Sequence, residues 1–277
     1  MNNLVFPFVH KAKPILKWAG GKTQMLDVLI PLMPNQYCNY IEPFFGGGAL
    51  FFAIQPQQAI ISDTNPELIN LYRVVSSQVE QLILELDKYY NDQDFFYEIR
   101  ALKFENLDNV QAAARTIFLN KTCFNGLYRV NKKGEFNTPF GKYKNPNIND
   151  SINLLRVSDI LKNKEIIQAD YFDVLEKYAK KNDFIFLDPP YFPISQYSDF
   201  KRYTKEQFSE QDQFKLSQCF KMLVDRGCYV LLTNSNHPLV YEYYSDFEIR
   251  CIDTKRHISC KGGTRTGEDI IVIGYDV

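Results

Sequence analysis

The segment Phe184-Ile185-Phe186-Leu187-Asp188-Pro189-Pro190-Tyr191 decides the fold of this chain. Its four apolar residues predict a buried strand, and the two prolines end that strand and stiffen the backbone behind it. In open α/β sheets, ligands bind beyond the carboxyl ends of the strands, where Asp188 and Tyr191 would lie. A flat heterocycle with an exocyclic amine fits there, because the amine can donate to the Asp188 carboxylate and the Pro189 carbonyl while Tyr191 stacks on the ring. The alternative is an Asp-Pro turn that only closes a strand.

Other short apolar runs extend this strand into a sheet. They predict further strands at residues 40–41, 59–61, 165–167, 229–232 and 270–275. Helical patterns lie between most of them, and Asn65-Pro66 and Ser209 with Asp212 are typical of helix starts. The alternation predicts an α/β domain with a mostly parallel sheet covered on both faces. Between about Leu71 and Lys164 it stops, and helical patterns with a polar, aromatic loop indicate an insertion.

The composition indicates a globular protein with a substantial core, because 45% of the 277 residues are hydrophobic and 23% are charged. The net charge of −1 means that any nucleic-acid site must be a local patch. The six cysteines are scattered and do not cluster with the three histidines, so we expect free thiols and no metal site. No signal peptide and no apolar run long enough for a bilayer are apparent, which predicts a cytoplasmic protein.

Two glycine-rich segments differ in what they indicate. Gly20-Gly21-Lys22-Thr23 is similar to a phosphate loop, but Leu16 stands where a Walker A motif needs glycine, which argues against an ATPase. The segment Glu42-Pro43-Phe44-Phe45-Gly46-Gly47-Gly48 follows a strand, and its glycines allow backbone to approach a ligand. Asp63 ends the next strand, where a carboxylate can bind ribose hydroxyls. The spacing differs from a dinucleotide fingerprint, so a nucleoside without phosphates suits the site; a tight turn is the alternative.

Basic residues gather in two places. Between residues 120 and 146 there are six basic side chains and one acidic one, interleaved with aromatic residues. Lys132-Lys133-Gly134-Glu135 is typical of a hairpin turn, and a basic β-ribbon can enter the major groove of DNA. Lys255, Arg256, Lys261 and Arg265 form a second cluster that we expect to contact phosphates. On charge alone, either cluster could be a solvated loop.

Five segments in this order resemble the motifs of the Dam-type (D12 class) DNA N6-adenine methyltransferases in their α arrangement. They are Lys17-Trp18-Ala19-Gly20-Gly21-Lys22, Glu42-Pro43-Phe44-Phe45-Gly46-Gly47-Gly48, the hairpin region Asn125-Gly126-Leu127-Tyr128-Arg129-Val130-Asn131 with residues 134–143, Asp188-Pro189-Pro190-Tyr191, and Leu232-Thr233-Asn234-Ser235. The resemblance runs from about Pro14 to the C-terminus.

The resemblance implies a Rossmann-like methyltransferase sheet with an inserted, mostly helical target-recognition domain that carries a β-hairpin. Residues 1–70 and 165–277 would form the catalytic domain and residues 71–164 the DNA-binding domain. The implied reaction moves the methyl group of S-adenosylmethionine to N6 of a flipped-out adenine in duplex DNA. The match of the hairpin favours GATC as the target sequence.

Site residues carry over by position. The catalytic set would be Asp188, Pro189, Pro190 and Tyr191. The cofactor set would be Trp18, Lys22, Phe44, Gly46, Gly48, Asp63, Asp170, Tyr171, Phe172 and Asp188. The DNA-binding set would be Phe124, Asn125, Arg129, Asn131, Lys132, Lys133, Pro139, Lys142, Lys255, Arg256, Lys261 and Arg265, with Arg129 as the reader of a guanine. Phe124 and Lys142 depart from the Tyr and Arg that are more usual in the enterobacterial branch.

Other acceptors and another class of protein stay open. N4-cytosine, RNA-adenine and protein-glutamine methyltransferases also use short Pro-Pro-aromatic motifs, although Asp188 and the hairpin favour DNA adenine. A DNA-binding protein that keeps an inactive methyltransferase fold is disfavoured by the intact Asp188 and Asp63. A cognate restriction endonuclease could be a functional partner, and a solitary role and the oligomeric state are left open.

Overall fold

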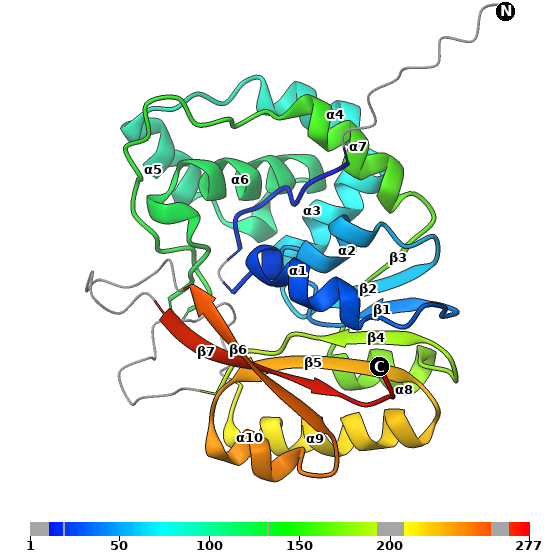
Figure 1. Cartoon of the computed structure of the whole chain (residues 1–277). Helices are drawn as coiled ribbons and strands as arrows, with labels where there is room; N and C mark the ends of the chain where they lie inside the picture. The colour runs from blue at the N-terminus through cyan, green and yellow to red at the C-terminus, as the bar shows by residue number, and fades with distance from the viewer. Residues whose placement is uncertain (1–10, 19, 132, 193–207, 256–265) are drawn as a thin grey trace, which may run out of the picture.

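The chain folds around a seven-stranded sheet with helices on both faces (Figure 1). The computed structural model describes residues 11–18, 20–131, 133–192, 208–255 and 266–277. The strands are β1 (Tyr40–Glu42), β2 (Ala59–Asp63), β3 (Glu165–Gln168), β4 (Phe184–Leu187), β5 (Tyr229–Ser235), β6 (Glu248–Lys255) and β7 (Thr266–Ile273), in the order β3-β2-β1-β4-β5-β7-β6. The expected α/β class is confirmed.

The sheet is parallel from β1 to β5, and β7 pairs antiparallel with both β5 and β6. Strand β6 was not predicted from the sequence. It is the edge strand, and its charged residues Glu248, Arg250 and Asp253 stand beside Ile249 and Ile252 and hide the apolar signal. Charged side chains are typical of edge strands, because they discourage pairing with another chain.

Helices surround the sheet and form the insertion. They are α1 (Leu26–Leu29), α2 (Ala49–Ile54), α3 (Pro66–Ser77), α4 (Val79–Leu86), α5 (Gln93–Ala101), α6 (Asn109–Thr122), α7 (Ser151–Leu161), α8 (Tyr171–Tyr178), α9 (Glu210–Asp225) and α10 (Pro238–Tyr243). The predicted caps are confirmed: the Asn65 side chain accepts from the Leu68 N–H, and Ser209 and Asp212 form a capping box. None of the helices in the described ranges is long and apolar enough to cross a membrane.

Strand β4 lies at the centre of two hydrophobic cores. Phe184 and Phe186 pack into the core that contains α2 and α3, whereas Ile185 and Leu187 pack into the core beneath α8 and α9. Successive side chains of a strand point to opposite faces, so an unbroken apolar run is the pattern of a strand covered on both sides. This double cover anchors the residues that follow Leu187.

The insertion between β2 and β3 is helical and carries an antiparallel ribbon. Phe96 of α5 and Phe118 of α6 share a core with Tyr128 and Phe136 of the ribbon. Two antiparallel bridges, between Val130 and Phe136 and between residues 123 and 140, define the ribbon. The predicted hairpin is therefore confirmed, with Gly134 at φ +84° in its turn; Lys132 lies outside the described residues.

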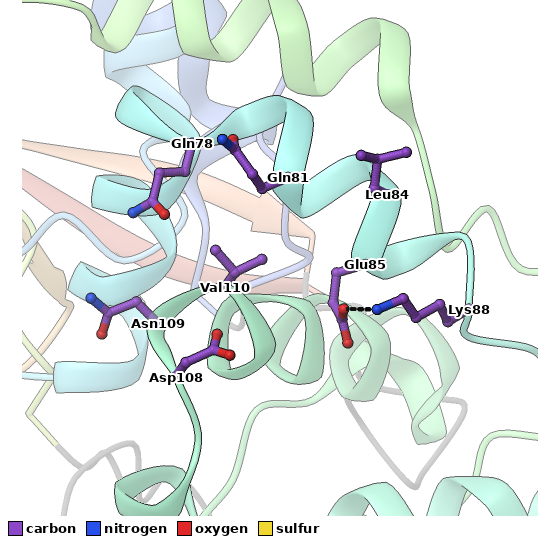
Figure 2. Close-up of a pocket in the computed structure, with 8 residues that line it drawn as sticks. All are labelled: Gln78, Gln81, Leu84, Glu85, Lys88, Asp108, Asn109 and Val110. Carbon is purple, nitrogen blue, oxygen red and sulfur yellow. Dashed lines mark hydrogen bonds and ion pairs between the residues drawn. The ribbon is translucent and has the colours of Figure 1, made fainter.

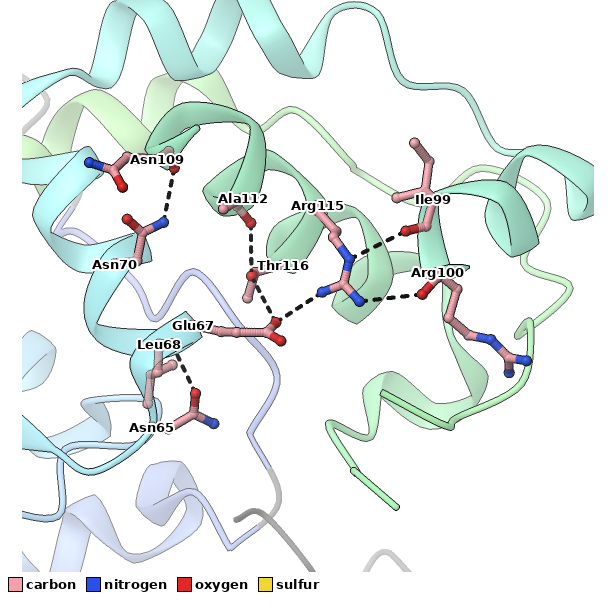
Figure 3. Close-up of polar contacts among 10 residues, drawn as sticks. All are labelled: Asn65, Glu67, Leu68, Asn70, Ile99, Arg100, Asn109, Ala112, Arg115 and Thr116. Atoms are coloured by element: carbon pink, nitrogen blue, oxygen red, sulfur yellow. Dashed lines mark hydrogen bonds and ion pairs between the residues drawn. The ribbon is translucent and has the colours of Figure 1, made fainter. Parts of the chain in front are cut away.

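A buried ion pair joins helix α6 to helix α3, the helix that follows β2 (Figure 3). Arg115 Nη1 of α6 lies 3.1 Å from Glu67 Oε2 of α3, and the rest of the guanidinium donates to the carbonyls of Ile99 and Arg100 at the end of α5. Burial raises the pKa of Glu67, and Arg115 opposes this shift. One arginine thus ties together three helices.

Candidate active site

The carboxyl ends of the parallel strands lie along one edge of the sheet, and several polar side chains follow them. From β1 the chain continues to β2 and β3 on one side, whereas β5 lies beyond β4 on the other. The crevice beside the adjacent strands β1 and β4 is therefore a topological switch point, where α/β proteins bind ligands. Asp188 follows β4 at this place.

The Asp188 carboxylate is held by two side chains from distant parts of the sequence. Lys22 Nζ lies 2.6 Å from Oδ1 and 2.7 Å from Oδ2, and the Thr233 hydroxyl donates to Oδ1 over 2.8 Å. A carboxylate offers about four lone-pair sites. Within the described residues, these contacts occupy three of them, so one site on Oδ2 remains for an outside donor.

Lys22 is a buried cation within this arrangement. Burial lowers the pKa of its ammonium, but Asp188 and Tyr191 outweigh that effect and raise the pKa above its ordinary value. Lys22 Nζ also donates to the Gly20 carbonyl and lies 4.7 Å from the centroid of the Tyr191 ring. The sequence places Lys22 in the cofactor set, and the structure brings it onto the carboxylate of the catalytic set.

Two buried side-chain amides, those of Gln213 and Asn234, hold the segment that follows Asp188 by hydrogen bonds to its backbone. Gln213 of α9 donates to the Pro190 carbonyl over 2.7 Å, and Asn234 of β5 donates to Gln213 and accepts from the Phe192 N–H. The Pro189 carbonyl is not part of this network. Gln213 was not predicted as a site residue from the sequence. It lies on the buried face of α9, three residues before Leu216, where a polar side chain needs a partner.

The glycine turn after β1 lies against Trp18. Gly46 and Gly48 have φ values of +48° and +63°, which favour glycine. A Cβ added to Gly46 would come 2.9 Å from the Trp18 ring, so the turn and the ring are in direct contact. Trp18 also stacks on Tyr128 of the insertion, with 5.0 Å between ring centroids. Both predicted cofactor elements thus meet at one point.

Asp63 orders this turn and keeps room for a ligand. Its Oδ2 accepts from the Gly46 N–H over 3.0 Å, and its Oδ1 accepts from the Asn65 N–H over 2.9 Å. Burial raises the pKa of Asp63, and these backbone donors partly offset the shift. The Thr64 N–H also donates to the carboxylate, so three of its roughly four lone-pair sites are occupied and one remains. The carboxylate can therefore still accept a hydrogen bond from a nucleoside hydroxyl.

The remaining predicted cofactor residues have different surroundings. Asp170 caps α8 by accepting from the Phe172 N–H over 2.9 Å. Tyr171 is buried and stacks on Phe44 at 5.1 Å, whereas the Phe172 side chain is 42% exposed. Of this group, Phe172 presents the open aromatic surface.

The predicted DNA-binding residues lie mostly on the ribbon and its flanks. Phe124 is 52% exposed, and Arg129 donates from Nε to Asn137 over 2.9 Å, which leaves its two terminal nitrogens outside that contact. Asn125 has φ +57°. The side chains of Lys133, Pro139 and Lys142 are exposed.

Asn131 shapes the ribbon turn, since its Oδ1 accepts from the N–H groups of Lys133 and Glu135. In the second basic cluster, Lys255 ends β6. Arg256, Lys261 and Arg265 lie outside the described residues.

A separate surface pocket of about 450 Å³ opens between α4 and the start of α6 (Figure 2). It is lined by Gln78, Gln81, Leu84, Glu85, Lys88, Asp108, Asn109 and Val110. Its lining contains no predicted site residue, and an ion pair of 2.6 Å between Lys88 and Glu85 crosses its rim. The pocket is a feature of the helical insertion and is separate from the sheet edge.

Comparison with known proteins agrees with this geometry. The family model described as D12 class N6 adenine-specific DNA methyltransferase matches residues 18–258. A Type II methyltransferase of Lactococcus lactis subsp. cremoris is 42% identical over 271 residues, which cover 95% of each chain. Another Type II methyltransferase, from Methanocaldococcus jannaschii, is 42% identical over 96% of this chain and 100% of its own. A DNA adenine methylase of Escherichia coli (strain K12) is 30% identical over 96% of each chain.

Proposed function

Because this chain belongs to the D12 class N6 adenine-specific DNA methyltransferases, we propose that it moves a methyl group from S-adenosylmethionine to N6 of an adenine flipped out of duplex DNA. The observation that carries the proposal is the Asp188 carboxylate at the switch point, held by Lys22 and Thr233 with one acceptor site left. Residues 1–70 and 165–277 would form the catalytic domain, and residues 71–164 the recognition domain.

The residues beside Asp188 suit the proposed methyl donor. S-adenosylmethionine supplies a methyl group that is already activated on a sulfonium. Asp63 can accept from a ribose hydroxyl, the turn at Gly46 and Gly48 lets the backbone approach the methyl donor, and Trp18 packs against that turn. Phe172, with its exposed ring, is the best placed of the residues proposed to border the adenine.

The acceptor nitrogen presents the chemical difficulty, because the adenine N6 lone pair is delocalised into the ring. Hydrogen bonds from N6–H to the Asp188 carboxylate and the Pro189 carbonyl favour a tetrahedral nitrogen. Positive charge develops on N6 during attack, and both acceptors stabilise it in the transition state. Lys22 and Thr233 hold the carboxylate in place for this task, and Asp188 can take the proton that N6 releases.

Base extrusion follows from where the target atom lies. The atom is inside the duplex, and unstacking the base costs a few kcal/mol. The exposed Phe124 and the left-handed Asn125 lie beside the ribbon and are proposed to fill the vacated stack. Tyr191, half-buried beside Lys22, is proposed to stack on the extruded base.

We expect Arg129→Ala to relax specificity at one base of the target by about 1–3 kcal/mol. The reason is that its terminal nitrogens can pair with guanine O6 and N7 while Nε stays on Asn137. Rates on duplexes that differ at each position of GATC measure the effect. The control is Lys133→Ala, which should weaken binding to all sequences alike and flatten the salt dependence. A uniform loss in Arg129→Ala would identify a phosphate contact instead.

Gly46→Ala should weaken binding of S-adenosylhomocysteine roughly tenfold or more, about 1.4 kcal/mol. The new methyl group would press on Trp18, and the residue would keep a positive φ that costs roughly 1–2 kcal/mol outside glycine. Calorimetry measures the dissociation constant. Gly134→Ala is the matched control, because Gly134 also has a positive φ but no atom of the described residues within 4 Å of an added Cβ. Equal affinities in both variants would contradict the proposed role of the Gly46 turn in binding the cofactor.

The direct test is transfer of a labelled methyl group to duplex DNA with and without GATC, followed by identification of the methylated nucleoside. N6-methyladenine confined to GATC supports the full proposal, and N4-methylcytosine, or label in RNA or protein, would contradict it. Likeness to Type II methyltransferases favours a role beside a restriction endonuclease, and a solitary role is the alternative. An endonuclease of the same target sequence in the host would distinguish the two roles.

A further inference from the structure

The segment that leads to Trp18 is anchored on the helical insertion. It runs from residue 11 beside α7 and α6 before it reaches the sheet (dark blue in Figure 1). Asn153 of α7 accepts from the Lys13 N–H over 2.9 Å and donates to the Lys13 carbonyl over 3.0 Å. Asn120 of α6 makes the same pair of contacts with Lys17, over 3.0 and 2.9 Å. Each amide thus clamps one backbone position.

Asn120 makes one contact more than Asn153. Its Nδ2 also donates to the Gly126 carbonyl over 3.1 Å, in the loop between α6 and the ribbon. The side chain is buried, and both amide hydrogens are used. A Cβ added to Gly126 would come 2.8 Å from the Lys17 side chain, so the loop and the leading segment are in direct contact. One amide fastens these two segments to each other.

The two segments serve different parts of the proposed reaction. Lys17 is followed by Trp18, which packs on the glycine turn, and then by Lys22, which pairs with Asp188. Gly126 lies between Phe124 and Arg129, which are proposed to contact DNA. Trp18, the residue after Lys17, stacks on Tyr128, two residues after Gly126, so the rings meet beside the contact between the two segments.

We propose that Asn120 is a positioning residue that holds the DNA-recognition loop in register with the cofactor side of the active site. This role rests on the function proposed above. Asn120 need not touch DNA or the methyl donor itself. Its loss should therefore weaken both binding events at once, because each depends on a segment that the amide holds.

The test is Asn120→Asp, which keeps the size of the side chain and removes both N–H donors. Asn153→Asp is the matched control, because it makes the same change in the clamp that does not reach the loop. For each variant, thermal unfolding is recorded, and the dissociation constants of S-adenosylhomocysteine and of a GATC duplex are measured. We expect Asn120→Asp to weaken both roughly tenfold, about 1.4 kcal/mol each, and Asn153→Asp to leave both within about twofold of wild type.

Gly126→Ala provides a second route if Asn120→Asp does not fold. The added methyl group presses on Lys17 from the recognition side, and we expect weaker binding of S-adenosylhomocysteine although the loop lies outside the cofactor set. Unchanged binding of both probes in Asn120→Asp, or a loss equal to that of Asn153→Asp, would overturn the proposed role. A wild-type protein that transfers no methyl group would overturn the proposed function instead.

Discussion

Replacing Asp188 with asparagine should reduce the rate of methyl transfer by about 10²–10⁴-fold. The substitution keeps the shape of the side chain but removes the negative charge that, in the proposed mechanism, stabilises N6 as it becomes positive. It also turns one oxygen into an N–H donor that opposes N6–H. Single-turnover transfer of labelled methyl groups to a GATC duplex measures the chemical step directly. Turnover at the wild-type rate would remove Asp188 from the mechanism.

The same substitution has a structural consequence that needs its own control. Lys22 is buried, and Asp188→Asn would leave its ammonium without a counter-charge. Removing one partner of a buried ion pair typically costs about 3–5 kcal/mol of the free energy of unfolding. Lys22→Met combined with Asp188→Asn removes both charges, so we expect urea unfolding near that of wild type and a rate of methyl transfer still reduced by about 10²-fold or more. Recovered activity in the double variant would show that Asp188→Asn had failed only through stability.

Glu67→Gln should lower the free energy of unfolding by about 3–5 kcal/mol. The amide cannot balance Arg115, which is buried and already donates to the two carbonyls that end α5 (Figure 3). Urea unfolding measures the change. Because the pair joins α6 to α3, which packs into the core beside the sheet, the loss should appear in the single transition of the whole chain.

Two further variants serve as controls for Glu67→Gln. Asp159→Asn breaks the exposed pair with Lys162, and we expect at most about 1 kcal/mol. Glu67→Leu with Arg115→Met removes both buried charges and should recover most of the stability, because apolar replacements of a buried pair are often neutral or better. If Glu67→Gln cost no more than Asp159→Asn, the ion pair would not hold the insertion.

Local patterns predicted most of the sheet and its caps. The run at residues 184–187 read as a strand covered on both faces because alternate residues enter different cores, and Asn65 and Ser209 act on backbone only a few residues away. Strand β6 was missed because its exposed edge carries charges that dilute the apolar signal. Sequence patterns report burial well and report exposed edges poorly.

Contacts between distant residues could not be predicted in this way. Lys22 and Asp188 lie 166 positions apart, and nothing in the glycine segment indicates which acid its lysine meets. Gln213 shows a different limit, because a polar residue on a buried helix face signals a partner without naming it. Asp170 and Asn131 bond to backbone close by, which is the ordinary behaviour of short acid and amide side chains.

The ion pair between Lys22 and Asp188 also bears on product release. The two opposite charges cancel within a buried site, and burial raises the pKa of the nearby Glu42 well above its ordinary value, which favours its uncharged form. The ion pair therefore offers a sulfonium little net attraction, and the proposed contacts to the ribose and adenine, which include Asp63, must supply most of the affinity. S-adenosylhomocysteine keeps those parts and lacks only the charge. We expect it to bind about as tightly as the methyl donor and to act as a strong product inhibitor, so that the cell must clear it to sustain turnover.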